Sequence, residues 1–274
     1  MTDDWLRATA RPVRLAKIDP TVPNVARVWN YLVGGRDNFA VDRNAARQLI
    51  EVAPVMAAVG PGSRAFLRRA VGYLAADVGV RQFLDIGTGI PTAGNTHEIA
   101  QAVASESRIV LVDNDPVVLA HARALLRSTV KGVTSYIDAD IRDPGKIIGA
   151  ARESLDFDQP VALVLIGTLT YVKRTDEVAA ILAALLDAVP PGSYLAVTQP
   201  ASDLGEAANE AQQCWNQAVP TPVWLRDRAA VTSWFDGLEL VEPGVVPVNQ
   251  WRPDDADPAY DGVLPLYGAV GRKR

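Results

Sequence analysis

From residue 81 onward, short apolar runs alternate with helical segments, and this alternation constrains the fold more than any other feature of the chain. Five of the runs have the length and apolar content of buried strands, and they span residues 81–87, 108–113, 133–137, 161–166 and 193–199. Helical segments lie between them, for example near 143–153 and 175–188. Because strands separated by helices pair in parallel through crossover connections, the sequence predicts a doubly wound, mostly parallel α/β sheet.

The last part of the chain departs from this rhythm. Two further apolar runs, at 238–242 and 265–273, are joined by a proline-rich loop without a helical segment. A connection of this kind allows antiparallel pairing of the two strands. We therefore expect a seven-stranded sheet whose last strand is antiparallel.

The composition divides the chain into three parts. Residues 1–23 contain three prolines and no sustained periodicity, which is typical of an extended arm. Residues 24–79 show helical spacing of apolar residues and are predicted to form an N-terminal helical cap. Residues 80–274 hold the sheet, and we expect this domain to form a single compact unit with the cap.

Within the cap, three helices are predicted. The first begins at Asn24 and ends at Gly34, because glycine is the residue that most often follows the last helical turn. The second is expected to begin near Asp37 or Asn38, and the third spans 62–77.

Charge and cysteine content exclude several classes of protein. The net charge of −5 and the pI near 5.1 provide no positive field for nucleic acid. Cys214 is the only cysteine, so no internal disulfide can form. The sequence contains no apolar run of membrane-spanning length, its first residues do not resemble a signal peptide, and no compact cluster of His, Asp or Glu marks a metal site. We expect a cytoplasmic protein without nucleic-acid or membrane partners, either monomeric or homodimeric.

The loop after the first predicted strand is the first candidate for a ligand site. In LDIGTGIPT, Asp85 ends the strand, and Gly87 and Gly89 allow the backbone to approach a ligand closely. Ligands of open parallel sheets bind beyond the carboxyl ends of the strands. The same pattern is also compatible with a tight strand-to-helix turn.

Acidic residues end the next two strands as well. Asp113 follows Gly89 by 24 positions, near the offset of about 20 residues at which a carboxylate meets the ribose hydroxyls of a nucleoside. Helix capping explains Asp115 and Pro116, which follow it, but not Asp113. Asp140, after the third strand, is placed to accept a hydrogen bond from an exocyclic amine, with Ile141 against the face of the base. Taken alone, Asp140 is better explained as a solvent-exposed loop acid, but acids at three successive strand ends together favour a nucleoside site.

At this point the sequence resembles a known group of enzymes. LDIGTGIPT, VLVDNDPVVLAHA and DADIRDP resemble motifs I, II and III of the class I S-adenosylmethionine-dependent methyltransferases. Together, NVARVWNYLVGGRDNFAVDR, RQFLDIGTGIPT, FDGLELVEPGVVPVNQWRP and YGAVGRK resemble a bacterial family of S-adenosyl methyltransferases whose substrates are largely unassigned. The resemblance spans about Asn24 to Lys273. It implies a Rossmann-like fold, a methyltransferase activity and S-adenosyl-L-methionine as the cofactor.

The resemblance also implies which residues bind the cofactor. The methionine part lies against the first strand-end loop, the ribose at the end of the second strand, and the adenine at the end of the third. The implied residues are Asp85, Gly87 and Gly89 for the methionine part, Asp113 for the ribose, and Asp140 with Ile141 for the adenine. Asn114 is implied as a further adenosine contact. Two positions depart from related patterns: Pro91 stands where many class I methyltransferases have a third glycine, and Thr170 stands where similar sequences often carry His.

The candidates for catalysis are fewer. Methyl transfer from a sulfonium is an in-line displacement, which alignment and exclusion of water can accelerate without a base. Tyr31, His97 and Tyr171 are the candidate catalytic residues, and Trp251 is a candidate wall of the acceptor pocket. The absence of an Asn/Asp-Pro-Pro-Tyr set after the fourth strand favours a neutral small molecule as the acceptor.

The stretch YLVGGRDNFAVDR, residues 31–43, has two interpretations. It is sufficiently explained as the turn between two helices of the cap. Alternatively, Tyr31, Gly35, Asp37 and Asn38 form a lid that closes over the methyl donor and shapes the acceptor pocket.

Two other functions remain compatible with the sequence. A protein that binds S-adenosylmethionine without turnover, as a sensor or partner-binding module, would explain the missing histidine at Thr170. A nicotinamide-dependent dehydrogenase shares the glycine and acid pattern, but its fingerprint requires Gly or Ala where Thr92 stands.

Overall fold

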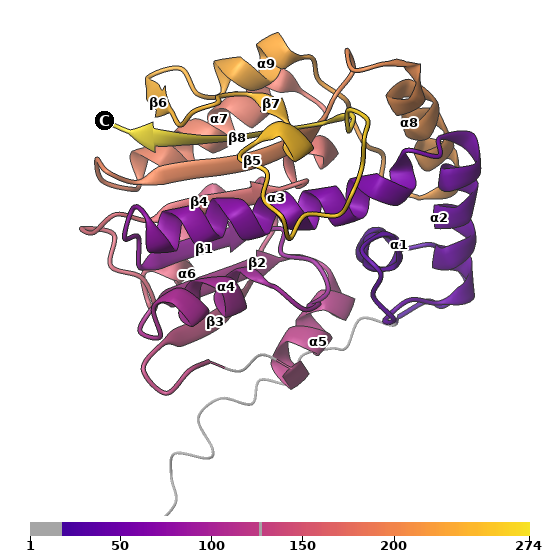
Figure 1. Ribbon diagram of the computed structural model, residues 1–274. Coiled ribbons are helices and arrows are strands. Elements are labelled where there is room, and N and C mark those ends of the chain that lie inside the picture. The colour runs from indigo at the N-terminus through magenta and orange to yellow at the C-terminus, as the bar shows by residue number, and fades with distance from the viewer. Residues whose placement is uncertain (1–17, 126–127) are drawn as a thin grey trace, which may run out of the picture.

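The computed structural model describes residues 18–125 and 128–274, and within them the chain forms one eight-stranded sheet (Figure 1). The strands are β1 (Gln82–Ile86), β2 (Arg108–Asp113), β3 (Val133–Asp138), β4 (Ala162–Ile166), β5 (Tyr194–Pro200), β6 (Leu238–Leu240), β7 (Val246–Pro247) and β8 (Leu266–Lys273). Their order is β3-β2-β1-β4-β5-β8-β6, and the short β7 pairs with β8. β1 to β5 pair in parallel, whereas β8 is antiparallel to β5, β6 and β7. The predicted doubly wound sheet with an antiparallel last strand is confirmed, and the short β7 adds an eighth strand to the seven that were predicted.

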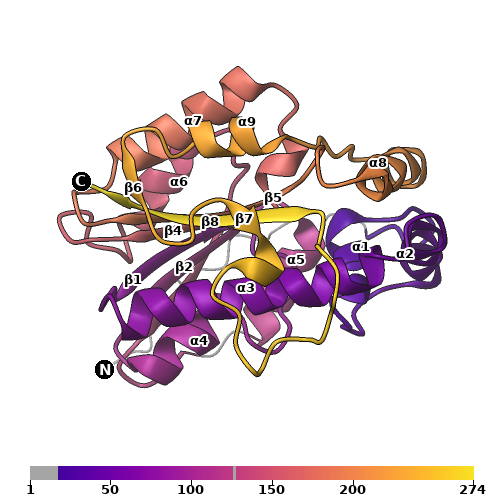
Figure 2. The same ribbon diagram turned by 45° about the horizontal axis from the view of Figure 1, so that its top comes forward.

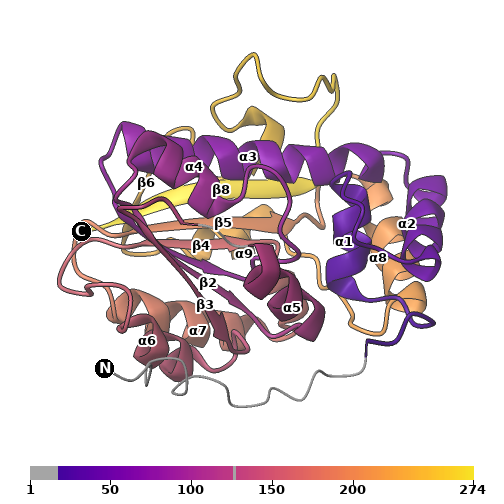
Figure 3. The same ribbon diagram turned by 90° about the horizontal axis from the view of Figure 1, so that it is seen from below.

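Helices cover both faces of the sheet (Figures 2 and 3). They are α1 (Val25–Leu32), α2 (Ala40–Val52), α3 (Met56–Ala76), α4 (Thr96–Val103), α5 (Pro116–Leu125), α6 (Pro144–Ala151), α7 (Thr175–Asp187), α8 (Glu206–Ala218) and α9 (Arg228–Ser233). Two short 3₁₀ helices, η2 (Leu169–Tyr171) and η3 (Val248–Gln250), follow β4 and β7.

Two hydrophobic cores lie on opposite faces because neighbouring strand residues point to opposite sides. On β1, Phe83 belongs to the core that α3 and α4 cover, and Leu84 belongs to the core beneath α6, α7 and α9. Both side chains are fully buried. This two-sided burial explains why the parallel strands are continuously apolar in sequence.

The N-terminal helices do not all have the same role. α3 lies along one face of the sheet, where Phe66 packs into the sheet core. α1 and α2 lie at one end of the molecule with α8, and Val28, Leu49 and Trp215 form a core between them (Figure 3). The predicted arm, residues 1–23, falls outside the described residues up to position 17.

The predicted start of the second helix is corrected. α2 begins at Ala40 rather than at Asp37 or Asn38. Asp42 satisfies the first turn of this helix, because its carboxylate accepts a hydrogen bond from the Phe39 amide at 2.8 Å.

The third helix also begins earlier than predicted. α3 begins at Met56, ahead of residue 62, and continues through Pro61. Proline lacks the N–H that would bond the carbonyl group of Ala57, so α3 loses one hydrogen bond near its beginning and continues without further loss.

No helix in the described part of the chain is long and apolar enough to cross a membrane.

Candidate functional site

A cavity of about 320 Å³ lies at the carboxyl ends of the parallel strands, beside the point between β1 and β4 where the strand order reverses. The loops after β1, β2, β3 and β4 form its floor, and residues of α1 and α3 form its walls. The volume is within the range of small-molecule sites. All seven residues expected to bind the cofactor line this cavity: Asp85, Gly87, Gly89, Asp113, Asn114, Asp140 and Ile141.

The two glycines of the first loop are required by backbone geometry. Gly87 and Gly89 have φ values of 79° and 68°, in the left-handed region that favours glycine. A Cβ on Gly87 would also lie 2.1 Å from the Thr168 Oγ1 atom, so the loop after β4 packs directly against it. These constraints keep the loop backbone exposed to the cavity.

Asp85 places a buried carboxylate beneath this loop. Its Oδ2 atom accepts a hydrogen bond from the Thr96 hydroxyl at 2.6 Å, while no donor in the described part of the chain contacts Oδ1. Burial raises the pKa of Asp85 to about 6, against the hydrogen bond of Thr96 and the positive charge of Arg64, which lower it. When Asp85 is ionised, the Thr96 hydroxyl and the charge of Arg64 compensate only part of the cost of burying its negative charge. The carboxylate therefore suits a cationic group of a ligand.

Asp113 is held at the end of β2 by backbone donors. Its two carboxylate oxygens accept hydrogen bonds from the Gly89 amide at 2.8 Å and the Asp115 amide at 3.0 Å. Burial raises its pKa to about 6. The adjacent Asp138 is its register partner on β3, but it is exposed and does not line the cavity. Of this pair, Asp113 lines the cavity and Asp138 does not.

Asp140 and Asn114 form the outer edge of the floor. The Asn114 side chain donates a hydrogen bond to Asp140 Oδ2 at 2.8 Å, and Arg142 forms an ion pair with Asp140 at 3.2 Å. Ile141 is buried beside them with 7% exposure. A polar edge and an apolar face therefore meet at the end of β3.

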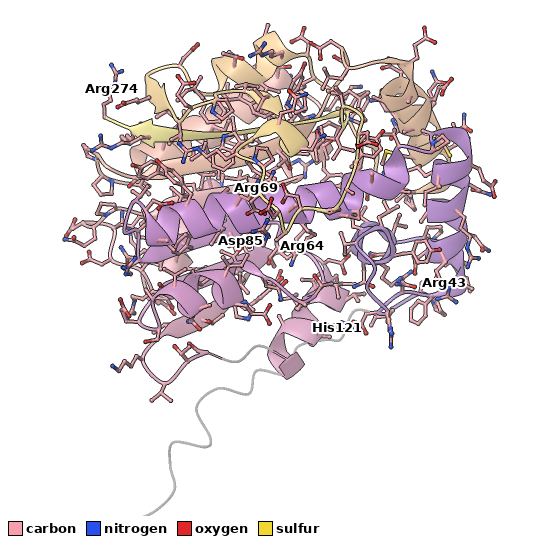
Figure 4. All side chains as sticks on the ribbon, viewed as in Figure 1. Arg43, Arg64, Arg69, Asp85, His121 and Arg274 are labelled. Atoms are coloured by element: carbon pink, nitrogen blue, oxygen red, sulfur yellow. The ribbon has the colours of Figure 1, made fainter. Side chains whose placement is uncertain are left out.

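Arg64 of α3 is a site residue that the sequence did not reveal. Its Nη2 atom donates to Ala93 O, Gly94 O and Asn95 Oδ1, and among the described residues no carboxylate lies within ion-pair distance of it. Burial lowers the pKa of its guanidinium, while Asp85 and Glu98 raise it. Figure 4 labels Arg64 and Asp85, which come from α3 and β1 to the same cavity. The sequence signal that could have identified Arg64 was a cationic residue on the buried face of α3, one helical turn before Leu67.

α1 forms one wall of the cavity and contacts η2, which follows the loop after β4. Trp29 and Asn30 of α1 line the cavity, together with Val33, the C-cap residue of α1, and Tyr171 of η2. The Trp29 indole N–H donates to the Tyr171 hydroxyl at 2.8 Å. Burial raises the pKa of Tyr171 above its ordinary value, so the phenol stays protonated at neutral pH.

The predicted lid residues do not line the cavity. Tyr31 follows Asn30 by one position, about 100° around the helix, and its ring lies beneath Arg47 of α2. Gly35, Asp37 and Asn38 lie behind Asn30 and contact its side chain. These four residues therefore lie one layer outside the residues that line the cavity, and their role as a lid stays a prediction.

Two other candidates also lie away from the cavity. His97 is the second residue of α4 and is 5% exposed, and its neighbour Thr96 is the side chain that reaches Asp85. Trp251 is fully buried in the sheet core, where its ring packs edge-on against Phe66 at 5.3 Å. Its large apolar ring stabilises the fold, which corrects its assignment to the acceptor pocket.

Comparison with known proteins agrees with this geometry. A family model described as S-adenosyl methyltransferase matches residues 12–274. The solved structure of a DUF574-family protein from Streptomyces avermitilis is 41% identical, covers 93% of this chain and 99% of its own, and has a TM-score of 0.89. A structure from Thermobifida fusca is 37% identical, with coverages of 93% and 96% and a TM-score of 0.84.

A SAM-dependent methyltransferase from Anabaena variabilis shares the fold alone, at 13% identity and a TM-score of 0.52 over 94% of this chain and 99% of its own. No curated protein matches the chain. With a family model that extends over nearly all of its length, the chain belongs to the S-adenosyl methyltransferase family, and it is an S-adenosyl-L-methionine-dependent methyltransferase.

Proposed function

We propose that this methyltransferase transfers a methyl group to a small-molecule acceptor held between the strand-end loops and α1. The observation that supports the proposal best is that the acids of three strand ends, Arg64 and α1 all line one cavity.

The residues present fit S-adenosylmethionine. In this proposal Asp113 binds the ribose hydroxyls, and Asp140 with Ile141 and Asn114 binds the adenine side. Asp85 and the backbone at Gly87 and Gly89 hold the methionine part, whose ammonium group complements the buried carboxylate. Arg64 completes the set as the partner of the methionine carboxylate, because it is a cation at the cavity without an acidic partner among the described residues.

When bound, S-adenosylmethionine supplies a methyl group on a sulfonium, which a nucleophile displaces in line. The chain contributes alignment and exclusion of water, and effective molarity alone is worth roughly 7 to 11 kcal/mol. Tyr171 is protonated and therefore serves as a hydrogen-bond donor rather than a base. His97 does not reach the cavity. The positions of Tyr171 and His97 therefore agree with catalysis by proximity, without a histidine base.

Thr170 does not favour the sensor alternative. Its side chain is 1% exposed, and its hydroxyl donates to the Trp224 carbonyl group at 3.1 Å. Thr170 does not line the cavity, so the absence of histidine at this position removes no group from it.

Calorimetry tests the proposed cofactor site. We expect the protein to bind S-adenosylmethionine and not NAD, and release of S-adenosylhomocysteine with small acceptors would then demonstrate turnover. Preference for NAD would contradict the proposal. Tight cofactor binding without product release across a broad acceptor library would favour the sensor.

Replacing Asp85 with asparagine is expected to stabilise the free protein and weaken cofactor binding. The pKa of Asp85 is about 6, above the ordinary 3.8. Its favourable contribution to stability is therefore present below the unfolded-state pKa and is lost as the pH rises through about 6, so the ionised group opposes folding at neutral pH. We expect asparagine to add about 1–3 kcal/mol to the free energy of unfolding near pH 7.5.

The measurement is thermal unfolding of both proteins near pH 7.5 and near pH 5, where the gain should shrink. S-adenosylhomocysteine affinity is measured in parallel and should fall in the variant. A variant that is less stable at neutral pH and binds with wild-type affinity would refute the role of Asp85.

A further inference from the structure

α1 lies along the cavity over its whole length. Its N-cap residue Asn24 and its C-cap residue Val33 both line the cavity, and so does Trp29 between them. The loops after β1, β2, β3 and β4 line the cavity as its floor. The position of α1 therefore sets how far a ligand on these loops is exposed to solvent.

Two polar contacts join α1 and the turn after it to α5 (Figure 3). Asn24 Nδ2 donates to Asp115 Oδ2 at 2.6 Å, and Asp37 Oδ1 lies 3.6 Å from His121 Nε2. The His121 ring is oriented for this contact, since its Nδ1 lies 2.8 Å from the carbonyl oxygen of Val117. Asp37 and His121 do not line the cavity. This outer contact can therefore be altered without touching a ligand.

The apolar packing of α1 is more extensive toward α2 and α8 than toward α5. Buried side chains of the three helices form one core, which includes Val28, Leu49 and Trp215. A smaller cluster joins α1 to α5, and Ala26 is the buried α1 side chain in it. An exposed ion pair adds little to such a contact. The boundary between α1 and α5 is therefore the one that separates at lowest cost, and α1, α2 and α8 stay together.

On its other side α1 is packed closely against α3. A Cβ on Gly60 would lie 2.3 Å from the carbonyl oxygen of Leu32, so the two helix backbones touch there. The chain also passes from α2 directly into α3 through residues 53–55. Toward η2, the Trp29 indole makes a single hydrogen bond to Tyr171, at 2.8 Å. The α3 side is therefore suited to be a pivot, and the α5 side to be the edge that opens.

A chain of hydrogen bonds connects this opening edge to the proposed ribose site. The Asp115 carboxylate accepts from Asn24, and the Asp115 amide donates to Asp113 Oδ1 at 3.0 Å. Asp113 is the residue that we propose for the ribose hydroxyls, so the inference below rests on the proposed function. A ribose on Asp113 would lie two hydrogen bonds away from the contact that closes α1 on α5.

We infer that α1, α2 and α8 form a gate that closes on α5 and opens there for each exchange of S-adenosylmethionine and S-adenosylhomocysteine. Asn24 and Asp37 are the two latch residues of this gate, and each has its partner on α5. In the closed gate, α1 excludes water from the cavity during methyl transfer. The gate moves a whole wall of the cavity, whereas the turn after α1 carries only its outer latch.

Tethering the opening edge tests the gate. Asp37→Cys and His121→Cys are combined with Cys214→Ser, which removes the only natural thiol. The two new thiols are joined by a short bis-maleimide that contains a reducible disulfide. Association and dissociation of radiolabelled S-adenosylhomocysteine are then measured. We expect tethering of the empty protein to slow association about tenfold or more, tethering of the complex to slow dissociation about as much, and reduction to restore both rates.

The same variant treated with N-ethylmaleimide is the matched control, because both thiols are then modified but not joined. It should exchange the ligand as the untreated variant does. Unchanged rates in the tethered protein would overturn the gate. Equal slowing by N-ethylmaleimide would overturn it as well, because the effect would then come from added bulk rather than from prevented opening.

Loss of the outer latch should have the opposite effect. Asp37→Ala keeps the backbone amide that donates to Asn30 and removes the carboxylate that faces His121. S-adenosylhomocysteine should dissociate about two- to fivefold faster from this variant, in line with the small contribution of an exposed pair. Arg36→Ala is the matched control, because Arg36 is the exposed neighbour of Asp37 and should leave the rate unchanged. Unchanged or slower release from Asp37→Ala contradicts the latch.

Failure of the proposed function would give a different result. If the wild-type protein does not bind S-adenosylhomocysteine, the proposed cofactor site is wrong and the gate is wrong with it. If the ligand binds and exchanges equally fast in the tethered and untethered protein, the cofactor site stands and only the gate is wrong.

Discussion

Replacing Asp113 with alanine should weaken S-adenosylhomocysteine binding by 1 kcal/mol or more, which is about fivefold or more in the dissociation constant. The carboxylate is rigidly held by the Gly89 and Asp115 amides, and each oxygen retains a lone pair for a ribose hydroxyl. The substitution would remove both hydrogen bonds that we propose between this carboxylate and the ribose. Calorimetry at fixed pH and salt measures the change.

Asp138→Ala is the matched control, because Asp138 is the register partner of Asp113 and is exposed outside the cavity. It should bind the ligand as the wild type does. To separate ribose recognition from loosening of the Gly89 loop, the 2′-deoxy analogue of S-adenosylhomocysteine is compared in wild type and Asp113→Ala. The wild type should prefer the ribose form, and Asp113→Ala should have lost that preference. Equal losses of affinity in Asp113→Ala and Asp138→Ala would refute the assignment.

Replacing Arg64 with alanine should produce the largest selective loss. A hydrogen bond to a charged group is worth about 1.5–3 kcal/mol, so S-adenosylhomocysteine should bind roughly 10- to 100-fold more weakly. 5′-Methylthioadenosine has no carboxylate, and its affinity should not change. The two ligands are titrated into wild type and variant under identical conditions.

Arg68→Ala serves as the control for this experiment, since Arg68 lies one turn further along α3 and pairs with Asp254 at 2.6 Å, away from the cavity. We expect it to leave both affinities unchanged. If Arg64→Ala weakens the two ligands equally, Arg64 supports the loop at residues 93–95 and does not bind the carboxylate.

The floor of the site was predictable from the sequence because strand ends carry local signals. An apolar run followed by an acid places Asp85, Asp113 and Asp140 at the same edge of a parallel sheet, whatever the details of packing. The same holds for the order of strands and helices, since buried strands and helices differ in length and periodicity. Gly34 was likewise predicted as the end of α1, and its φ of 82° confirms it.

The walls were not predictable, because they depend on which side of a buried helix faces the ligand. α1 buries Val28 against α2 and α8 and Asn30 beside the cavity, so periodicity cannot separate its two buried sides. Tyr31 and Asn30 are adjacent in sequence, yet only Asn30 lines the cavity. Trp251 illustrates the same limit: a tryptophan after β7 suits a pocket wall or a core equally well until its partners are known.

The stretch around the double glycine forms the turn between α1 and α2. Its residues hold the side chain of Asn30, whose Oδ1 accepts from the Asp37 amide and from Asn38 Nδ2, each at 2.9 Å. A Cβ at position 35 would collide with this side chain, which explains why a second glycine follows the one that ends the helix. Closure of these residues over the methyl donor stays a prediction.

A crystal structure of the complex with S-adenosylhomocysteine tests the central claim most directly. We predict the ligand in the cavity at the ends of β1, β2 and β3, with its ribose hydroxyls on Asp113, its adenine beside Asp140 and its carboxylate on Arg64. A ligand bound outside this cavity, or inside it with adenine at Arg64 and the carboxylate at Asp140, would contradict the assignment of the site.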